Sequence, residues 1–97
     1  MLSRLHDENM DRLFEAMLTL ETVEDCYDFF RDLCTVPELL AMKQRLWVAR
    51  LLKEDLIYSD IVEITGASTA TISRVNRSLQ YGDGGYLLAL ERLGKAE

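Results

Sequence analysis

The sequence predicts an all-α fold in a single domain. Apolar residues recur three and four positions apart through most of the chain, which is the spacing of amphipathic helices. No segment alternates apolar and polar residues as a strand of a sheet would. The chain has 97 residues, 48% of them hydrophobic, and a single proline, so a disordered, Pro-rich or multidomain protein is excluded.

Two amphipathic helices are predicted within residues 1–34. A break at residues 19–22 separates them, because Thr22 can cap the second helix and Asp25 favours its first turn. Their apolar stripes are Met10, Leu13, Phe14, Met17 and Leu18 in the first helix, and Val23, Cys26, Tyr27, Phe30, Leu33 and Cys34 in the second.

A central helix is predicted over residues 35–53. Its start has a capping Thr35, a proline in the first turn at Pro37, and Glu38 three residues after the cap. Apolar residues from Leu39 to Leu52 then leave little polar face, and a helix that is apolar on most sides has to be packed on most sides. In so short a chain, we expect a second subunit to supply part of that cover.

Residues 57–80 predict a helix-turn-helix. Gly66 stands where the end of a helix favours a residue that tolerates positive φ, and Ser68 can cap the helix that follows. The apolar faces of the two helices are Tyr58, Ile61, Val62 and Thr65 in the first, and Ile72, Val75 and Leu79 in the second.

The solvent face of the second helix carries the candidate DNA contacts. Residues 64–82 contain no acid, and short polar side chains precede two arginines along this face. Short side chains let a helix approach the major groove closely, and a guanidinium binds guanine or phosphate. The alternative is an ordinary αα-hairpin whose arginines are only solvated. The candidate DNA-binding residues are Ser68, Thr69, Ala70, Ser73, Arg74 and Arg77.

Charge is unevenly distributed along the chain, whose net charge is −6. Residues 1–40 hold 3 basic and 10 acidic residues, a net charge of −7, whereas residues 41–80 hold 6 basic and 4 acidic residues, a net charge of +2. A protein that coats DNA nonspecifically would be basic throughout, but a specific reader can confine its positive charge to one face. Surface patterning without a function is the alternative.

These segments resemble a known family. Residues 66–79, with the sequence GASTATISRVNRSL, are similar to the helix-turn-helix of the Trp repressor superfamily, and within it to the YerC/YecD group of Trp-repressor-like bacterial proteins. The likeness extends to LCT at 33–35 and YGDGGY at 81–86. It implies six helices, the last over 84–94, in an intertwined homodimer whose dimerisation helices within 1–34 wrap around the partner.

The resemblance also locates the family's tryptophan site, in which the indole lies between two arginines. Arg74 matches the second arginine and Ser78 matches a nearby serine. The first arginine falls on Gln44, with Arg45 next to it. Val75 stands where the family has a glycine, and its methyl groups would occupy the space of an indole and fill part of the dimer core instead. We therefore expect regulation without tryptophan, and Arg45, Arg74 and Ser78 are the candidate pocket for another small-molecule effector, which the sequence does not identify.

No catalytic, cofactor or metal site is predicted, so we expect no enzyme. The acidic pairs at 24–25 and 54–55 have no histidine or nucleophile nearby. Cys26 and Cys34 form no CxxC pair, and the single His6 has no partner at the spacing of metal ligands. No apolar run is long enough to cross a membrane, and the charged start of the chain is unlike a signal peptide. A reducing cytoplasm is the expected setting.

Together these features predict a dimeric transcriptional regulator that places the helix at 68–80 in the major groove of double-stranded DNA. The alternative is a protein-interaction module with the same fold, which binds another regulator or a polymerase rather than DNA. The net negative charge favours that alternative.

Overall fold

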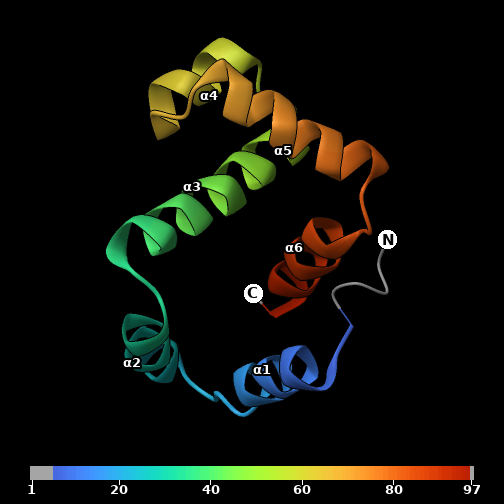
Figure 1. The fold of residues 1–97 in the computed structure, drawn as a ribbon. Coiled ribbons are helices and arrows are strands. Elements are labelled where there is room, and N and C mark those ends of the chain that lie inside the picture. The colour runs from blue at the N-terminus through green and yellow to red at the C-terminus, as the bar shows by residue number, and fades with distance from the viewer. Residues whose placement is uncertain (1–5, 97) are drawn as a thin grey trace. The chain divides into compact units, whose positions relative to one another are not determined.

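The computed structural model describes residues 6–96, and this part of the chain contains six α-helices and no strand (Figure 1). The all-α prediction is therefore confirmed. Residues 1–5, part of the charged start that argued against a signal peptide, lie outside the described residues. The helices are α1 (Glu8–Leu18), α2 (Val23–Leu33), α3 (Val36–Lys53), α4 (Tyr58–Thr65), α5 (Thr69–Tyr81) and α6 (Gly85–Ala96).

The chain divides into two compact units, an N-terminal unit up to Val36 and a C-terminal unit from Pro37. The N-terminal unit contains α1 and α2, and the C-terminal unit contains nearly all of α3 and the three helices that follow. The segment predicted as the central helix, 35–53, forms α3. The segment predicted as the helix-turn-helix, 57–80, forms α4 and α5, and 84–94 forms most of α6.

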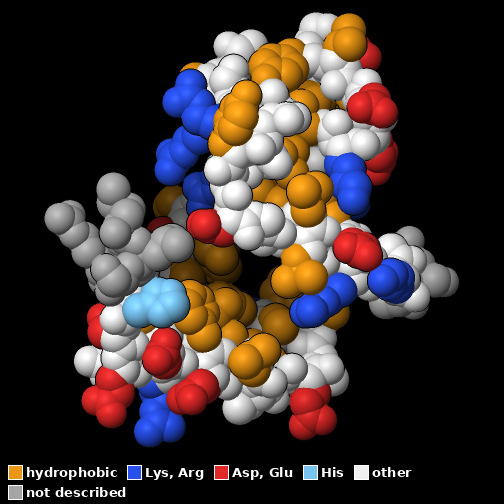
Figure 2. Space-filling view, turned by 90° about the vertical axis from the view of Figure 1, so that its right-hand side faces the viewer, with side chains coloured by type: hydrophobic (Ala, Val, Ile, Leu, Met, Phe, Trp, Pro, Cys, Tyr) orange, Lys and Arg blue, Asp and Glu red, His pale blue; other side chains and the backbone are white. Residues whose placement is uncertain are grey.

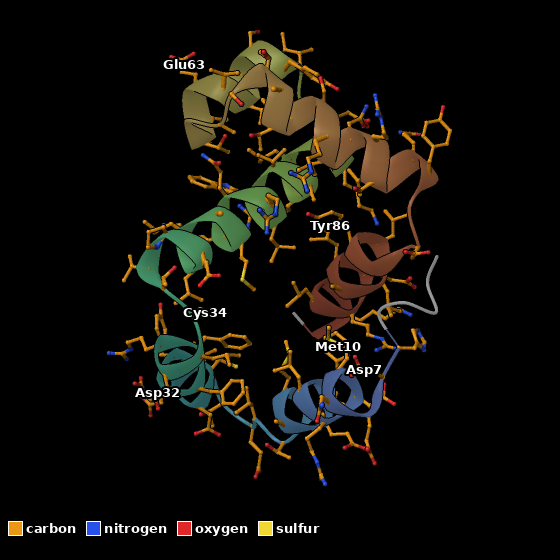
Figure 3. The ribbon with its side chains drawn as sticks, in the orientation of Figure 1. Asp7, Met10, Asp32, Cys34, Glu63 and Tyr86 are labelled. Carbon is orange, nitrogen blue, oxygen red and sulfur yellow. The ribbon has the colours of Figure 1, made fainter. Side chains whose placement is uncertain are left out.

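Side-chain caps define both helices of the N-terminal unit. The carboxylate of Asp7 accepts a hydrogen bond of 2.7 Å from the backbone N–H of Met10, and Figure 3 labels both residues. At the start of α2, Thr22 Oγ1 accepts from the N–H of Asp25 at 3.0 Å, and the Asp25 carboxylate accepts from the N–H of Glu21 at 3.1 Å. These bonds satisfy donors that have no partner within a helix, and the bond from Glu21 lowers the pKa of Asp25 below its ordinary value.

The apolar stripes of α1 and α2 find no core within their own unit. Neither helix contains a buried residue. Leu18 is 84% exposed and Val23 is 74% exposed, and Phe14, Tyr27 and Leu33 are also exposed. The N-terminal unit thus presents apolar helix faces to the surroundings of the single chain.

The core of the C-terminal unit lies where α3, α4 and α5 meet. In Figure 1, α4 and α5 lie side by side across α3, and α6 follows α5. Partly buried side chains surround this core, among them Tyr86 and Leu90 of α6 (Tyr86 is labelled in Figure 3). The buried core residues are Val48, Ala49 and Leu51 of α3, Ile61 of α4, Ala67 of the turn, and Ile72 and Val75 of α5.

The helix-turn-helix is therefore anchored by apolar contacts on its inner side. The predicted buried face of α5 is observed, since Ile72 and Val75 are buried and Leu79 is half-buried. Among the described residues, no helix is both long and apolar enough to cross a membrane.

Candidate nucleic-acid interface

The turn between α4 and α5 is short and tightly bonded. Gly66 ends α4 in the left-handed conformation, with φ 73° and ψ 4°, and its N–H donates to the carbonyl of Val62 at 2.8 Å. Ser68 caps the start of α5, and its Oγ accepts from the N–H of Thr71 at 3.1 Å. This geometry is the one that the sequence predicted from a glycine and a serine two positions apart.

Replacing Gly66 by alanine should lower the free energy of unfolding by about 1–2 kcal/mol, because an L side chain strains the left-handed conformation. A Cβ at Gly66 would meet no atom within 4 Å, so the cost is conformational and not steric. Urea denaturation measures it. Gly94→Ala in α6 is the matched control, since its φ is ordinary and its Cβ also meets no atom. If Gly66→Ala lowers the free energy of unfolding no more than Gly94→Ala does, the left-handed conformation at Gly66 would be contradicted.

All six candidate DNA-binding residues lie at the surface of the C-terminal unit. Thr69, Ala70 and Ser73 are exposed, as are Arg74 and Arg77, and neither arginine forms an ion pair with any described residue. In Figure 2, Lys and Arg side chains gather along one edge of the part that contains α4 and α5, and acidic side chains lie along the opposite edge with a basic side chain just below them. The exposed face of α5 thus offers two unpaired guanidinium groups in a stretch without acids.

Ser68, also exposed, has a structural task at the same time. Its hydroxyl accepts from the N–H of Thr71 and donates to Thr71 Oγ1, at 3.1 Å in each case. A hydroxyl so engaged keeps one acceptor site for an outside partner. Thr69 and Ala70 directly follow it in the first turn of α5, so the position of this end of the helix depends on how the turn is held.

The candidate effector residues lie in different environments. Arg45 of α3 is half-buried, whereas Arg74 and Ser78 of α5 are exposed. Val75, next to Arg74, is 1% exposed and belongs to the core of its own chain, so it needs no second subunit to bury it. The glycine position of the resembled site is thus filled by a fully packed side chain.

A hollow of about 340 Å³ lies elsewhere in the C-terminal unit, between α3 and α6. Its walls contain none of the three candidate effector residues. The lining residues of the hollow are Lys43, Leu46, Trp47, Arg50, Leu90 and Leu93.

Within residues 6–96 there is also no group of three or more His, Cys, Asp or Glu side chains that could hold a metal ion.

Gln44 has a role that the sequence did not predict. Its side-chain Nε2 donates to the backbone carbonyl of Thr65 at 3.3 Å, and this bond joins α3 to the end of α4. The resemblance marked Gln44 only as the residue in place of an arginine. The available signal was its position, one turn before Val48 on the face of α3 that turns toward the core.

With this geometry established, the family follows from sequence comparison. The family model described as Trp repressor protein matches residues 8–94. The chain belongs to the Trp repressor family. This match runs from the start of α1 into α6, so the resemblance inferred from residues 66–79 and their flanks is confirmed.

Individual relatives of this Trp repressor family member cover nearly its whole length. It is 48% identical over 96 residues to the uncharacterized protein YerC of Bacillus subtilis (strain 168), covering 99% of this chain and 92% of YerC. It is 52% identical to a TrpR-like protein from Eubacterium eligens ATCC 27750, with a TM-score of 0.92 and 95% of each chain covered. It is 49% identical to a candidate Trp repressor from Staphylococcus aureus, whose crystal structure matches with a TM-score of 0.93 and covers 96% of this chain and 93% of that one. These relatives support the YerC-like group and the six-helix fold.

Proposed function

We propose that the protein is a sequence-specific DNA-binding transcriptional regulator that inserts α5 into the major groove. The observation that carries this proposal is the division of α5 into two faces. Ile72 and Val75 fix one face in the core, and the other presents Arg74 and Arg77 without ion pairs among the described residues. A groove-binding helix has to be anchored on one side and unobstructed on the other.

In the proposed complex, the first turn of α5 approaches the base edges. Thr69, Ala70 and Ser73 have side chains short enough for close approach, and Arg74 and Arg77 bind guanine or phosphate. Two-fold symmetry of a dimer gives a palindromic site. The half-sites of such dimers, Trp repressor among the examples, lie about one helical turn, roughly 34 Å, apart.

The proposed assembly is a homodimer, and exposed apolar surface supports it. Leu40, Met42 and Leu46 of α3 are 40–51% exposed in the single chain, and α1 and α2 bury no residue. The hollow between α3 and α6 is lined by leucine and tryptophan and by two cations, Lys43 and Arg50. Apolar helices from an acidic segment such as residues 1–40 have the chemistry to cover such surfaces in a second copy.

The proposal includes DNA binding without tryptophan. Val75 is 1% exposed and belongs to the core, so an indole at that position of α5 would have to displace its side chain. The proposal also includes a small-molecule effector other than tryptophan, not identified by its chemistry, that binds near Arg45, Arg74 and Ser78.

Selection from a random-sequence DNA library, with the purified protein at near-physiological salt and no added ligand, tests the function. We expect a palindrome with half-sites one helical turn apart, bound by two chains as measured by sedimentation. Adding tryptophan should change neither the sequence recovered nor its affinity. If a sequence were recovered only with tryptophan, the ligand-independent mechanism would be wrong. If none were recovered with or without a pool of amino acids, the protein-interaction alternative would be favoured.

The second candidate function is a protein-interaction module with the same fold. The net charge of −6 and the apolar faces of α1 and α2 are the observations that favour it. A heparin column at low salt distinguishes the two candidates. A DNA reader with its positive charge gathered on one face should be retained, whereas a module that binds only protein should pass through.

A further inference from the structure

The hydrogen bond from Gln44 gives the carbonyl of Thr65, at the end of α4, a donor. The last carbonyls of a helix have no partner within it, so each needs a donor from elsewhere. Gly66 supplies its own N–H to the carbonyl of Val62, and the amide of Gln44 supplies a donor to the carbonyl of Thr65 at 3.3 Å. The bond is partly buried and joins residues 21 positions apart, so it ties α3 directly to the helix-turn-helix.

Thr65 passes this attachment on to the turn. Its Oγ1 donates to the carbonyl of Ile61 at 2.7 Å and accepts from the N–H of Ala67 at 3.1 Å. Ile61 and Ala67 both lie in the core, and Ser68, the N-cap of α5, directly follows Ala67. Thr65 therefore joins α3, through its carbonyl, to the turn residue Ala67, through its hydroxyl, and Ala67 stands one residue before the N-cap of the helix that we propose reads DNA.

The close-packed core positions α5 through the shape of its side chains, and the hydrogen bond of Gln44 adds a directional constraint at the turn. A hydrogen bond weakens steeply as its angle and length depart from the optimum. The amide of Gln44 therefore restricts those motions in which the turn slides along α3.

We propose that Gln44 is a positioning residue, which holds the start of α5 in its DNA-binding orientation without a bound ligand. The inference rests on the proposed function and deepens it, because it names an internal contact that orients α5 in the free protein. Gln44 acts through Thr65 and the turn. Its side chain needs no contact with DNA.

Gln44→Met removes the donor and keeps an unbranched, uncharged side chain of similar length. We expect the ratio of affinities for the selected operator and for random-sequence DNA to fall about tenfold, since each subunit of the dimer loses one hydrogen bond. Affinity for random DNA should stay unchanged, because the phosphate contacts are retained. Amide hydrogen exchange of the free protein at Gly66 and Ala67 should become roughly threefold faster, because local opening of one turn involves a single lost bond, with exchange in α1 and α2 unaffected.

Gln44→Lys is the matched variant, because it restores a donor of similar reach. Its added charge affects operator and random DNA alike, so the ratio of the two affinities should return toward the wild-type value. An unchanged ratio in Gln44→Met, or the same loss in Gln44→Lys, would overturn the inference. A general loss of stability would instead lower both affinities and accelerate exchange throughout, which also contradicts a positioning role.

Failure of the proposed function is distinguishable from failure of this inference. If the wild-type protein selects no DNA sequence, the proposed function fails, and hydrogen exchange of the free protein alone decides about Gln44. Faster exchange confined to Gly66 and Ala67 in Gln44→Met then supports the conclusion that the bond from Gln44 to Thr65 holds the turn in place. Unchanged exchange there rejects it.

Discussion

Arg77→Ala should weaken operator binding by at least about 30-fold. Each arginine that binds a base or phosphate contributes about 1–3 kcal/mol, and a dimer loses two such arginines, one from each subunit. Arg77 is exposed and has no ion pair among the described residues, so its substitution should leave folding intact, with a change in the free energy of unfolding within about 0.5 kcal/mol. Fluorescence anisotropy with labelled operator measures the affinity.

The salt dependence of binding shows what Arg77 binds. If it binds phosphate, the slope of log affinity against log salt should become shallower by about one unit for each phosphate that is no longer neutralised, and random DNA should be affected equally. If it binds a base, the weaker binding should be confined to the operator. Arg92→Ala is the matched control, because Arg92 is an exposed arginine of α6, outside the helix-turn-helix, without an ion pair in the described part of the chain. Wild-type affinity in Arg77→Ala would remove Arg77 from the interface.

Ile61→Ala should lower the free energy of unfolding by about 2–5 kcal/mol. Ile61 is 0% exposed and is the buried residue that α4 contributes to the core, so its truncation removes apolar packing and leaves a cavity. A loss of this size is a large part of the stability of a small domain. Denaturation in urea, at one fixed protein concentration because dimer stability depends on concentration, measures the effect.

Ile64→Ala is the control for this prediction. It changes the same residue type in the same helix, but Ile64 is 48% exposed, so we expect a change within about 0.5 kcal/mol. Equal losses of stability at the two positions would mean that α4 does not pack as described. The comparison also isolates the anchoring of α4 from its helix propensity, which is the same for both substitutions.

Most of the helix-turn-helix could be predicted from its sequence, because its signals are local. Gly66 marks the left-handed end of α4, and Ser68 caps α5 through a residue three positions on. The periodicity of Ile72, Val75 and Leu79 separates the buried face of α5 from the exposed face with its arginines. Spacing within one helix determines which residues share a face, whatever lies opposite.

Two features were decided only by the tertiary structure. The sequence places Val75 in the core of a dimer, whereas it is buried in the core that α3, α4 and α5 of its own chain form together. The sequence shows Gln44 only as a replaced arginine, whereas its amide holds the carbonyl of Thr65. Both features depend on the angle and distance at which α3 crosses the helix-turn-helix.

The sequence by itself determined the helices, the caps of α2 and α5 and the polar face of α5, because each depends on residues within a few positions of one another. The tertiary structure decided which polar group of α3 reaches the turn and which core the apolar face of α5 enters. The physical reason is that packing of one helix on another is set by the joint shape of many side chains, and no periodicity within a single helix encodes that shape.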